Sequence, residues 1–475
     1  MLTQRVIDHL RLKVGAENVY HETEDLLVYG YDATPEISAL PDVAVFPETI
    51  DGLKAALAVS REEGLSVTPR GAATGLSGGS TPIKGGMVVG LTRMNRIVEI
   101  DEENLTATAQ AGVITVDLFN AVAAKGLFYP PDPGSQSVST LGGNVAENAG
   151  GLRGLKYGVT RNYVMALNGL LADGTEFITG GKCVKDVAGY SLRDLLVGSE
   201  GTLGIITEVT VRLISPPQEK RTLLAYFRDI RTAGEAVSRI IAARIIPATL
   251  EIMDKTTINC VEDYAAIGLP RQMEALLLIE VDGHPAVVAE EAAGVRRILE
   301  EVRADEVHQA DTAAEAARLA AARRTALTAV ARVSPTTILE DATVPRSCLA
   351  ETFAEIERLK EKYRVRVATF GHAGDGNLHP TALTDERDRT EVEHVHAFFA
   401  ELYEKVLAMG GTVSGEHGIG SAKKGYLLRQ FGEGGMAVMR RIKDSFDPGG
   451  LLNPGKIFTD RAAPSAVRIP GGRHV

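Results

Sequence analysis

The chain has 475 residues, of which 44% are hydrophobic and 24% charged, and its formal net charge is -11 at pH 7. This length fits two or three domains that can bury a large ligand, and the composition excludes disordered and fibrous proteins. The negative charge argues against general binding to nucleic acid or to anionic lipid surfaces.

The chain carries three cysteines, Cys183, Cys260 and Cys348. Their wide spacing offers neither a disulfide framework nor a CxxC metal or cluster site, so we expect a reducing cytoplasm. The N-terminal stretch reads as a short amphipathic helix, and nowhere do 18 apolar residues follow one another without a charge. We therefore expect neither a signal peptide nor a membrane span.

The first predicted elements form one βαβ unit. A strand at 43–46 leads into a helix at 50–63, with Thr49 as its N-cap and Gly64 as its stop, and a second strand follows at 65–68. Leu53, Ala56, Leu57 and Ser60 fall on one face of this helix.

Two hairpins follow. Residues 96–100 and 105–110 flank a polar turn, and Asp173-Gly174 joins two further apolar runs. The first half thus reads as mixed α+β and ends near 215–217, where two prolines stand together.

The second half begins with a ferredoxin-like order, βαββαβ. Its elements are expected at 223–227 (strand), 230–243 (helix), 248–253 (strand), 274–281 (strand), 286–302 (helix) and a short run near Val307. An Ala-rich helical stretch at 312–330 and two later helices carry the chain to a Gly-rich end.

A glycine-rich loop, PRGAATGLSGGSTP at 69–82, follows the second strand. Its glycines let consecutive backbone N–H groups converge on an anion, and its hydroxyl side chains add donors. This loop is expected to bind a pyrophosphate. The alternative is that it is a solvent-exposed loop rich in turn residues.

Further segments share this composition. They are PDPGSQSVSTLGGNVAENAGGLRGLKYG at 131–158, GSEGTLGIITEVTVRL at 198–213, and FDPGGLLNPGKIF, which contains Asn453. Glycines at so many positions leave the backbone without side chains, which favours its close approach to a flat, extended ligand.

With these motifs the sequence resembles the FAD-binding domain of the vanillyl-alcohol oxidase superfamily, in the branch of glycolate oxidase FAD subunits, D-lactate dehydrogenases and other D-2-hydroxy-acid dehydrogenases. The resemblance covers nearly the whole chain. It implies an α+β fold with a two-subdomain FAD-binding domain at 1–217, whose core spans about 38–217. It also implies a substrate or cap domain at 218–475, built on a ferredoxin-like antiparallel sheet, whose C-terminal segment returns to the flavin.

The resemblance also implies the FAD contacts. Residues 69–80 would wrap the pyrophosphate, 133–158 would border the pyrophosphate and isoalloxazine, and 200–206 would lie by the adenosine half. The residues so assigned are Pro69, Arg70, Gly71, Ala72, Thr74, Gly75, Leu76, Ser77, Gly78, Gly79, Pro133, Gly134, Thr140, Gly142, Gly143, Asn148, Gly150, Gly151, Tyr157, Gly158, Glu200, Gly204, Ile206 and Asn453.

We expect the FAD to be non-covalent. Some relatives attach it through a histidine in or just after the glycine loop, whereas this chain has no histidine between His21 and His284.

Histidines cluster in two other glycine-rich pieces, FGHAGDGNLHP and SGEHGIG. His372 and His379, with Glu416 as a third ligand, would hold a divalent metal (Zn, Fe or Mn) with positions left open for a substrate. The alternative is that these histidines are ordinary polar groups, because HxxxxxxH spacing alone has many false positives.

The resemblance implies this same ligand set and makes the next histidine, His417, the base. A metal beside the substrate hydroxyl makes its proton acidic, and a neutral imidazole then accepts that proton. The reverse assignment stays open, with His417 as a fourth ligand and Glu416 only supporting the site.

Arg323 matches the family's substrate-carboxylate arginine, since a planar guanidinium pairs with both carboxylate oxygens. The alternative for Arg323 and Arg324 is a solvated positive helix face. Relatives specific for 2-hydroxyglutarate carry a lysine two residues before the aspartate that matches Asp341, where this chain has Leu339. This departure favours lactate or glycolate over a diacid.

The remaining candidates are expected to be structural. His394 and His396 read as a surface helix face, and Cys183 as a small packed residue rather than a flavin ligand.

The expected function is oxidation of a small D-2-hydroxy acid, with the electrons passed to a partner. Too few cysteines are present for an iron–sulfur cluster, so the acceptor is an iron–sulfur subunit, an electron-transfer flavoprotein, a quinone system or oxygen. Such a partner could hold the chain at the inner membrane, and a homodimer stays open. Two other functions stay open as well: a non-redox alkyl transfer as in the ether-lipid synthases, whose run of adjacent histidines is absent, and a flavin-holding electron-relay subunit.

Overall fold

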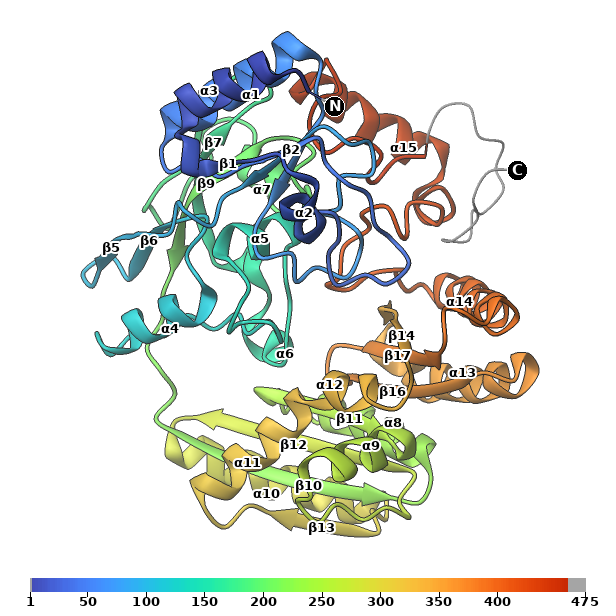
Figure 1. The fold of residues 1–475 in the computed structure, drawn as a ribbon. Helices are drawn as coiled ribbons and strands as arrows, with labels where there is room; N and C mark the ends of the chain where they lie inside the picture. The colour runs from blue at the N-terminus through green and yellow to red at the C-terminus, as the bar shows by residue number, and fades with distance from the viewer. Residues whose placement is uncertain (1, 460–475) are drawn as a thin grey trace. The chain divides into compact units, whose positions relative to one another are not determined.

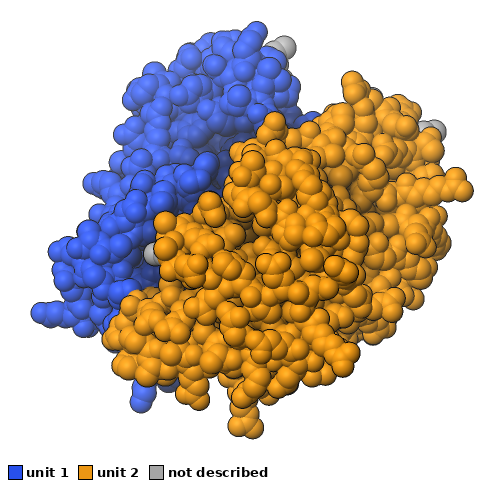
Figure 2. All heavy atoms as spheres, turned by 90° about the horizontal axis from the view of Figure 1, so that it is seen from below, with its two compact units in different colours: residues 1–149, 159–216, 416–475 blue, residues 150–158, 217–415 orange. Residues whose placement is uncertain are grey.

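The computed structural model describes residues 2–459, and the contacts within it divide the chain into two compact units. Unit 1 comprises Met1–Ala149, Val159–Pro216 and Glu416–Val475, and unit 2 comprises Gly150–Gly158 and Pro217–Gly415 (Figure 2). The chain thus enters unit 2 twice, and its last segment belongs to unit 1.

The first sheet of unit 1 has the strand order β1-β2-β4-β3, and β4 runs parallel to β2 and β3. Its strands are β1 (Val19–Tyr20), β2 (Val43–Val45), β3 (Val67–Arg70) and β4 (Met87–Gly90). Helix α3 (Ile50–Glu63) connects β2 to β3, so the predicted βαβ unit is confirmed, with β4 inserted between its two strands.

Capping residues set both ends of α3. The hydroxyl of Thr49 accepts a hydrogen bond from the backbone N–H of Gly52 at 3.1 Å, and Gly64 closes the helix in the left-handed conformation at φ 66°. The N–H of Leu65 donates back to the carbonyl of Ser60 at 2.8 Å. Because Leu65 belongs to the helix end, β3 begins at Val67, two residues later than predicted.

The second sheet of unit 1 is antiparallel throughout, with the order β5-β6-β9-β7-β8. Its strands are β5 (Ile97–Asp101), β6 (Thr106–Gln110), β7 (Val164–Leu170), β8 (Glu176–Gly180) and β9 (Ile205–Arg212). The two predicted hairpins are β5–β6 and β7–β8, and Gly174 takes a positive φ of 86° in the turn of the second.

Helices of unit 1 pack on both sheets. They are α1 (Gln4–Val14), α2 (Thr23–Leu26), α3, α4 (Thr115–Ala123), α5 (Leu141–Glu147), α7 (Leu192–Leu196) and α15 (Leu427–Phe446). Leu118 of α4 and Val145 of α5 share one core cluster with Leu167 and Val209 of the second sheet.

Unit 2 is built on one large antiparallel sheet with the order β13-β10-β12-β11-β16-β17-β14, and β15 pairs with β17. Its strands are β10 (Glu219–Phe227), β11 (Thr249–Asp254), β12 (Ala275–Gly283), β13 (Glu306–Gln309), β14 (Thr336–Leu339), β15 (Ala342–Thr343), β16 (Arg366–His372) and β17 (Asn377–Thr384). The section β13-β10-β12-β11 has ferredoxin-like order and pairing, as predicted (Figure 1). The hairpin β16–β17 extends this section beside β11.

The helices of unit 2 are α6 (Gly154–Tyr157), α8 (Ile230–Ala242), α9 (Lys255–Ala265), α10 (Pro285–Glu301), α11 (Ala313–Arg324), α12 (Ala326–Ala331), α13 (Leu349–Tyr363) and α14 (Arg389–Ala408). Ile258 of α9 and Val330 of α12 pack in one core cluster with Leu276 and Leu278 of β12. Two features differ from the prediction: α9 was not expected, and the stretch expected at 312–330 breaks at Thr325. None of the helices within the described residues is long and apolar enough to cross a bilayer.

Asp254 explains why α9 forms and supplies a pH-dependent prediction. Its buried carboxylate accepts hydrogen bonds from the backbone N–H and the hydroxyl of Thr257 at 2.8 and 2.7 Å, which caps the helix. Burial raises the pKa of Asp254 to about 6.

Since the pKa of Asp254 is higher in the folded protein, its ionisation destabilises the fold as the pH rises from about 4 to about 6. Asp254→Asn keeps the cap but cannot ionise. We therefore expect its melting temperature to exceed that of the parent by more at pH 8 than at pH 4, through a free-energy difference of about 3 kcal/mol at most. Parallel melting temperatures of the two proteins between pH 4 and pH 8 would refute this role.

Candidate active site

The glycine-rich loop after β3 lies in unit 1 against other segments that the sequence assigns to FAD. A Cβ atom on Gly71 would lie 2.4 Å from the hydroxyl of Thr140, the N-cap of α5. The side-chain amide of Asn453 donates to the carbonyls of Gly79 and Glu200 at 2.8 and 2.7 Å. The structure thus brings together the loop, the start of α5, the turn at Glu200 and Asn453.

The final segment of the chain also reaches this loop. The backbone N–H of Ser421 donates to the carbonyl of Ser77 at 3.0 Å, and a Cβ atom on Gly78 would lie 2.4 Å from the Ser421 hydroxyl. Glycine is required at position 78 for this close approach and for its positive φ of 70°.

Buried ionisable groups lie beside the loop. The carboxylate of Glu200 accepts hydrogen bonds from the backbone N–H groups of Ile419 and Gly420 at 2.7 and 2.6 Å. Burial raises the pKa of Glu200, and burial together with the Glu200 charge raises that of Glu147 well above its usual range. Burial lowers the pKa of Lys456 to about 8. Glu200 was predicted from the sequence, whereas Glu147 and Lys456 were not.

Several predicted FAD residues have structural partners of their own. The guanidinium of Arg70 donates to the carbonyls of Tyr31 and Val28 at 2.8 and 3.0 Å. Asn148 adopts a left-handed conformation, and its side chain accepts a hydrogen bond from the N–H of Arg161 at 2.9 Å. Ile206 packs in the core cluster of the second sheet.

Other predicted FAD residues belong to unit 2. Residues 150–158, which include Gly150, Gly151, Tyr157 and Gly158, group with that unit. The hydroxyl of Tyr157 donates to Asp282 at 2.7 Å, and the ammonium group of Lys156 pairs with the same carboxylate at 2.6 Å. Asp282 thus ties this segment to the end of β12.

The two histidines of the predicted metal site lie side by side in unit 2. The β16–β17 hairpin pairs Phe370 with His379 and His372 with Asn377, so His372 and His379 fall on one face of the sheet. Both side chains are buried, and their ring centroids are 5.1 Å apart.

A buried carboxylate lies near the Nδ1 atom of each histidine. Glu251 of β11 lies 2.7 Å from Nδ1 of His372, and Asp341 lies 4.0 Å from Nδ1 of His379. Burial alone would raise the pKa of Glu251, but its contacts with His372 and Arg323 hold that pKa below its usual value. Glu251 was not predicted from the sequence, although a carboxylate in the middle of the largely apolar strand TLEIMD is a detectable anomaly.

Asp341 also anchors the chain that leads to the other two predicted residues. Its carboxylate accepts hydrogen bonds from the hydroxyl of Ser414 and the N–H of Gly415 at 2.7 and 2.8 Å. Glu416 and His417 follow directly on the chain and open the last segment of unit 1.

The structure separates the two arginines of α11. Arg324 is exposed, as expected of a solvated helix face, whereas Arg323 is buried. The guanidinium of Arg323 lies 2.5 Å from Glu251 and 5.0 Å from the ring centroid of Phe370, and its Nε atom has no hydrogen-bond partner among residues 2–459. Arg323, Glu251 and His372 therefore form one buried chain of charged and polar groups.

The predictions for the two histidines of α14 and for Cys183 have different outcomes. His394 is exposed and His396 half-buried on α14, which confirms the surface helix face. Cys183 is exposed in the loop between β8 and α7, so the prediction of a packed residue is wrong. Val184 and Val187 in the same loop are exposed as well, so this loop offers no apolar core in which the thiol could pack.

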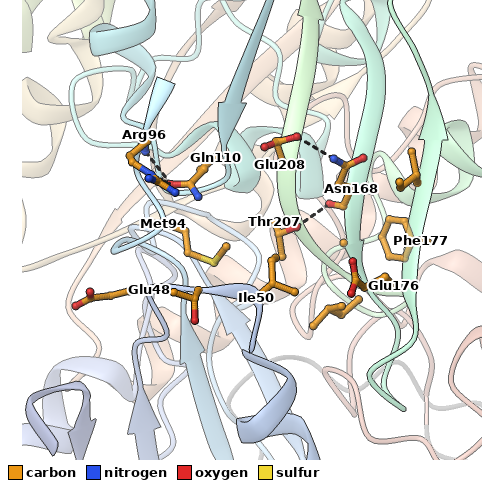
Figure 3. Close-up of a pocket in the computed structure, with 14 residues that line it drawn as sticks. Glu48, Ile50, Met94, Arg96, Gln110, Asn168, Glu176, Phe177, Thr207 and Glu208 are labelled. Atoms are coloured by element: carbon orange, nitrogen blue, oxygen red, sulfur yellow. Dashed lines mark hydrogen bonds between the residues drawn. The ribbon is translucent and has the colours of Figure 1, made fainter. Parts of the chain in front are cut away.

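A pocket of about 250 Å³ lies in unit 1 (Figure 3). It is lined by residues of α3, β5 to β9 and their flanks, and none of the predicted FAD residues lines it. In its lining, the side chains of Asn168 and Glu208 bond at 2.8 Å and those of Arg96 and Gln110 at 3.4 Å, while Glu176 pairs with Lys54 and Glu48 with Arg93. It therefore gives no support for a second ligand site.

Comparisons with known proteins agree with this arrangement. A family model described as FAD linked oxidases, C-terminal domain, matches residues 216–457, and a model described as FAD binding domain matches residues 41–180. The chain is 50% identical over 467 residues to the glycolate oxidase subunit GlcD of Bacillus subtilis, covering 98% of this chain and 99% of that protein. It is 36% identical to the D-lactate dehydrogenase of Anaerostipes hadrus, over 94% of each chain.

Among solved structures, p-cresol methylhydroxylase with substrate bound matches with a TM-score of 0.81 at 16% identity, covering 97% of this chain and 98% of that one. At this identity the match shows the fold, which is the α+β fold of the vanillyl-alcohol oxidase type expected from the sequence. The family models and the close relatives show more: this chain belongs to the FAD-linked oxidases and is an FAD-dependent oxidoreductase.

Proposed function

We propose that this oxidoreductase converts a small D-2-hydroxy acid, of the glycolate or D-lactate type, into the 2-oxo acid. Two relatives that match nearly the whole chain are named for these substrates. The observation that carries the proposal is the buried Arg323, whose Nε atom has no hydrogen-bond partner, next to the histidine pair. A guanidinium with a free donor suits a substrate carboxylate. Leu339 offers no charge for a second one.

His372, His379 and Glu416 are the proposed ligands of a divalent metal, Zn, Fe or Mn. Glu251 bonds Nδ1 of His372, and Asp341 lies 4.0 Å from Nδ1 of His379, an arrangement in which the Nε2 atoms would be the ligand atoms. Glu416 is the next residue after Gly415, which Asp341 holds, and this connection supports it as the third ligand. A divalent metal at these ligands would polarise the substrate hydroxyl.

His417 is the proposed base. Its imidazole would accept the hydroxyl proton while the hydrogen on Cα leaves with its electron pair, so that the alcohol becomes a carbonyl. Arg323 would hold the carboxylate and thereby orient the Cα–H bond. Bound FAD supplies the hydride acceptor at its N5 atom.

The FAD itself is proposed to lie non-covalently on the segments that carry the predicted contacts. The loop at 69–80 with Asn453 would hold the pyrophosphate, and the backbone approach at Gly71 and Gly78 supports this position. No histidine between His21 and His284 is available for a covalent link.

The reduced flavin must pass its electrons on, and we propose an iron–sulfur subunit or an electron-transfer flavoprotein as the acceptor. The three cysteines, Cys183, Cys260 and Cys348, are unpaired in the structure and are too few to bind such a cluster within this chain. A relative is named as one subunit of glycolate oxidase, which supports a partner.

Product analysis tests the proposal. With an artificial electron-accepting dye in place of the partner, glycolate or D-lactate should yield one molecule of glyoxylate or pyruvate for each two-electron reduction of the dye. Absence of any 2-oxo acid, with the flavin fully loaded, would contradict the proposed function.

A further inference from the structure

Glu251 is a buried carboxylate in the middle of strand β11. Its side chain is 1% exposed, and all six residues of β11 are buried. The register pairs Ile252 with Gly371 of β16, so the preceding residue, Glu251, lies opposite His372 on the same face of the sheet. The pairing of these two strands therefore places a carboxylate beside one histidine of the proposed metal site.

Both oxygens of this carboxylate are engaged. One lies 2.7 Å from Nδ1 of His372, and the other lies 2.5 Å from a terminal nitrogen of Arg323. All three side chains are buried, so these contacts are poorly screened by water. An oxygen that lies against a guanidinium is a poor metal ligand, so Glu251 is not counted among the proposed ligands.

We infer that Glu251 is a positioning residue shared by the metal site and the substrate-carboxylate site. This inference rests on the proposed function. By accepting a hydrogen bond from the Nδ1–H group of His372, Glu251 selects the tautomer in which Nε2 carries the lone pair that a metal would need. By pairing with Arg323, it holds the guanidinium against the ring of Phe370 and leaves Nε free for the substrate carboxylate.

The two contacts distinguish this role from simple charge neutralisation. If Glu251 only neutralised Arg323, its contact with His372 would be incidental and metal affinity would not depend on it. Glutamine has one accepting oxygen and one donating nitrogen, so Glu251→Gln can satisfy His372 or Arg323 but not both. The exchange keeps the size of the side chain and removes the shared function.

The matched control is Asp254→Asn. Asp254 is a second buried carboxylate on β11, but it caps α9 and bonds to Thr257. Zinc affinity of the FAD-loaded proteins is measured by equilibrium dialysis against chelator-buffered zinc and elemental analysis. We expect Glu251→Gln to bind zinc about 10- to 100-fold more weakly than the parent, and Asp254→Asn to bind as the parent does.

A substrate readout accompanies the metal readout. Glu251→Gln should also raise KM for the hydroxy acid at saturating zinc, because Arg323 loses its partner. Arg323→Gln should raise KM while its zinc affinity stays within about threefold of the parent, since His372 keeps Glu251. Should Glu251→Gln not fold, Glu251→Asp keeps the charge at a shorter reach, and it should weaken zinc binding because it cannot make both contacts.

The outcomes separate this inference from the proposed function. A parent that binds no divalent metal would overturn both the inference and the proposed metal site. If the parent binds zinc and His372→Ala does not, the proposed site stands. Unchanged zinc affinity in Glu251→Gln, or in Glu251→Asp if only that variant folds, would then overturn the inference alone. If Arg323→Gln loses as much zinc affinity as Glu251→Gln does, Glu251 is only a counter-ion of Arg323. That result would also overturn the inference.

Discussion

Replacing His417 by asparagine is expected to slow reduction of the bound flavin by about two to four orders of magnitude. Asparagine keeps similar size and some hydrogen bonding but has no basic nitrogen, so the hydroxyl proton loses its acceptor. The rate is measured by mixing the FAD-loaded protein with the hydroxy acid in the absence of oxygen. Flavin content and metal content should equal those of the parent.

His394→Asn is the matched control, because it makes the same exchange at an exposed position of α14 and should leave the rate unchanged. Two results would contradict the assignment of His417. Loss of the metal in His417→Asn would make this histidine a ligand. A rate change of less than about tenfold with the metal retained would mean that another group is the base.

Replacing His372 by alanine is expected to remove the metal and slow flavin reduction by about 10³-fold, while the FAD remains bound. A divalent metal at the proposed site would contribute several kcal/mol to stabilising charge at the substrate oxygen, and each 1.36 kcal/mol corresponds to a factor of ten. His372 lies in unit 2, whereas the glycine loop and Asn453 lie in unit 1, so flavin content should not follow metal content. Elemental analysis, the flavin spectrum and anaerobic kinetics measure the three quantities.

His394→Ala serves as the control for this exchange. Prolonged chelation of the parent should reproduce the effect of His372→Ala, and zinc should restore the chelated parent but not the variant. Full activity in a parent protein that contains no metal would disprove the metal site.

Local order in this chain follows closely from local sequence. Helix α3 has the predicted bounds, because Thr49 and Gly64 act through contacts with residues a few positions away. The ferredoxin-like order of β10 to β13 was predicted as well, because it depends on the alternation of apolar runs. Strand β3 begins two residues later than predicted, because the N–H of Leu65 bonds to the end of the helix instead of joining the sheet.

Contacts between segments that are distant in the chain could not be predicted from the sequence. Glu251 and His372 are 121 positions apart, and only the pairing of β11 with β16 shows that they touch. Arg323 was predicted as a substrate contact from a resemblance, but its pairing with Glu251 depends on how α11 packs on the sheet. Two adjacent arginines look alike in sequence, and burial alone distinguishes Arg323 from Arg324.

Cys183 shows that the average burial of a residue type can mislead a prediction for one position. Cysteine is among the residues most often buried, and this average predicted a packed side chain. The loop after β8 is exposed over its apolar residues too, so the tertiary structure overrides the residue's general tendency.

The most direct test of the proposed function is reduction of the bound flavin in the absence of oxygen, followed spectroscopically with glycolate, D-lactate and L-lactate. The proposed function predicts that glycolate or D-lactate bleaches the flavin within one turnover, that L-lactate does so far more slowly, and that the bleached flavin regains its colour with an electron-accepting dye. A flavin that stays oxidised with every D-2-hydroxy acid, in protein fully loaded with FAD and zinc, would contradict it.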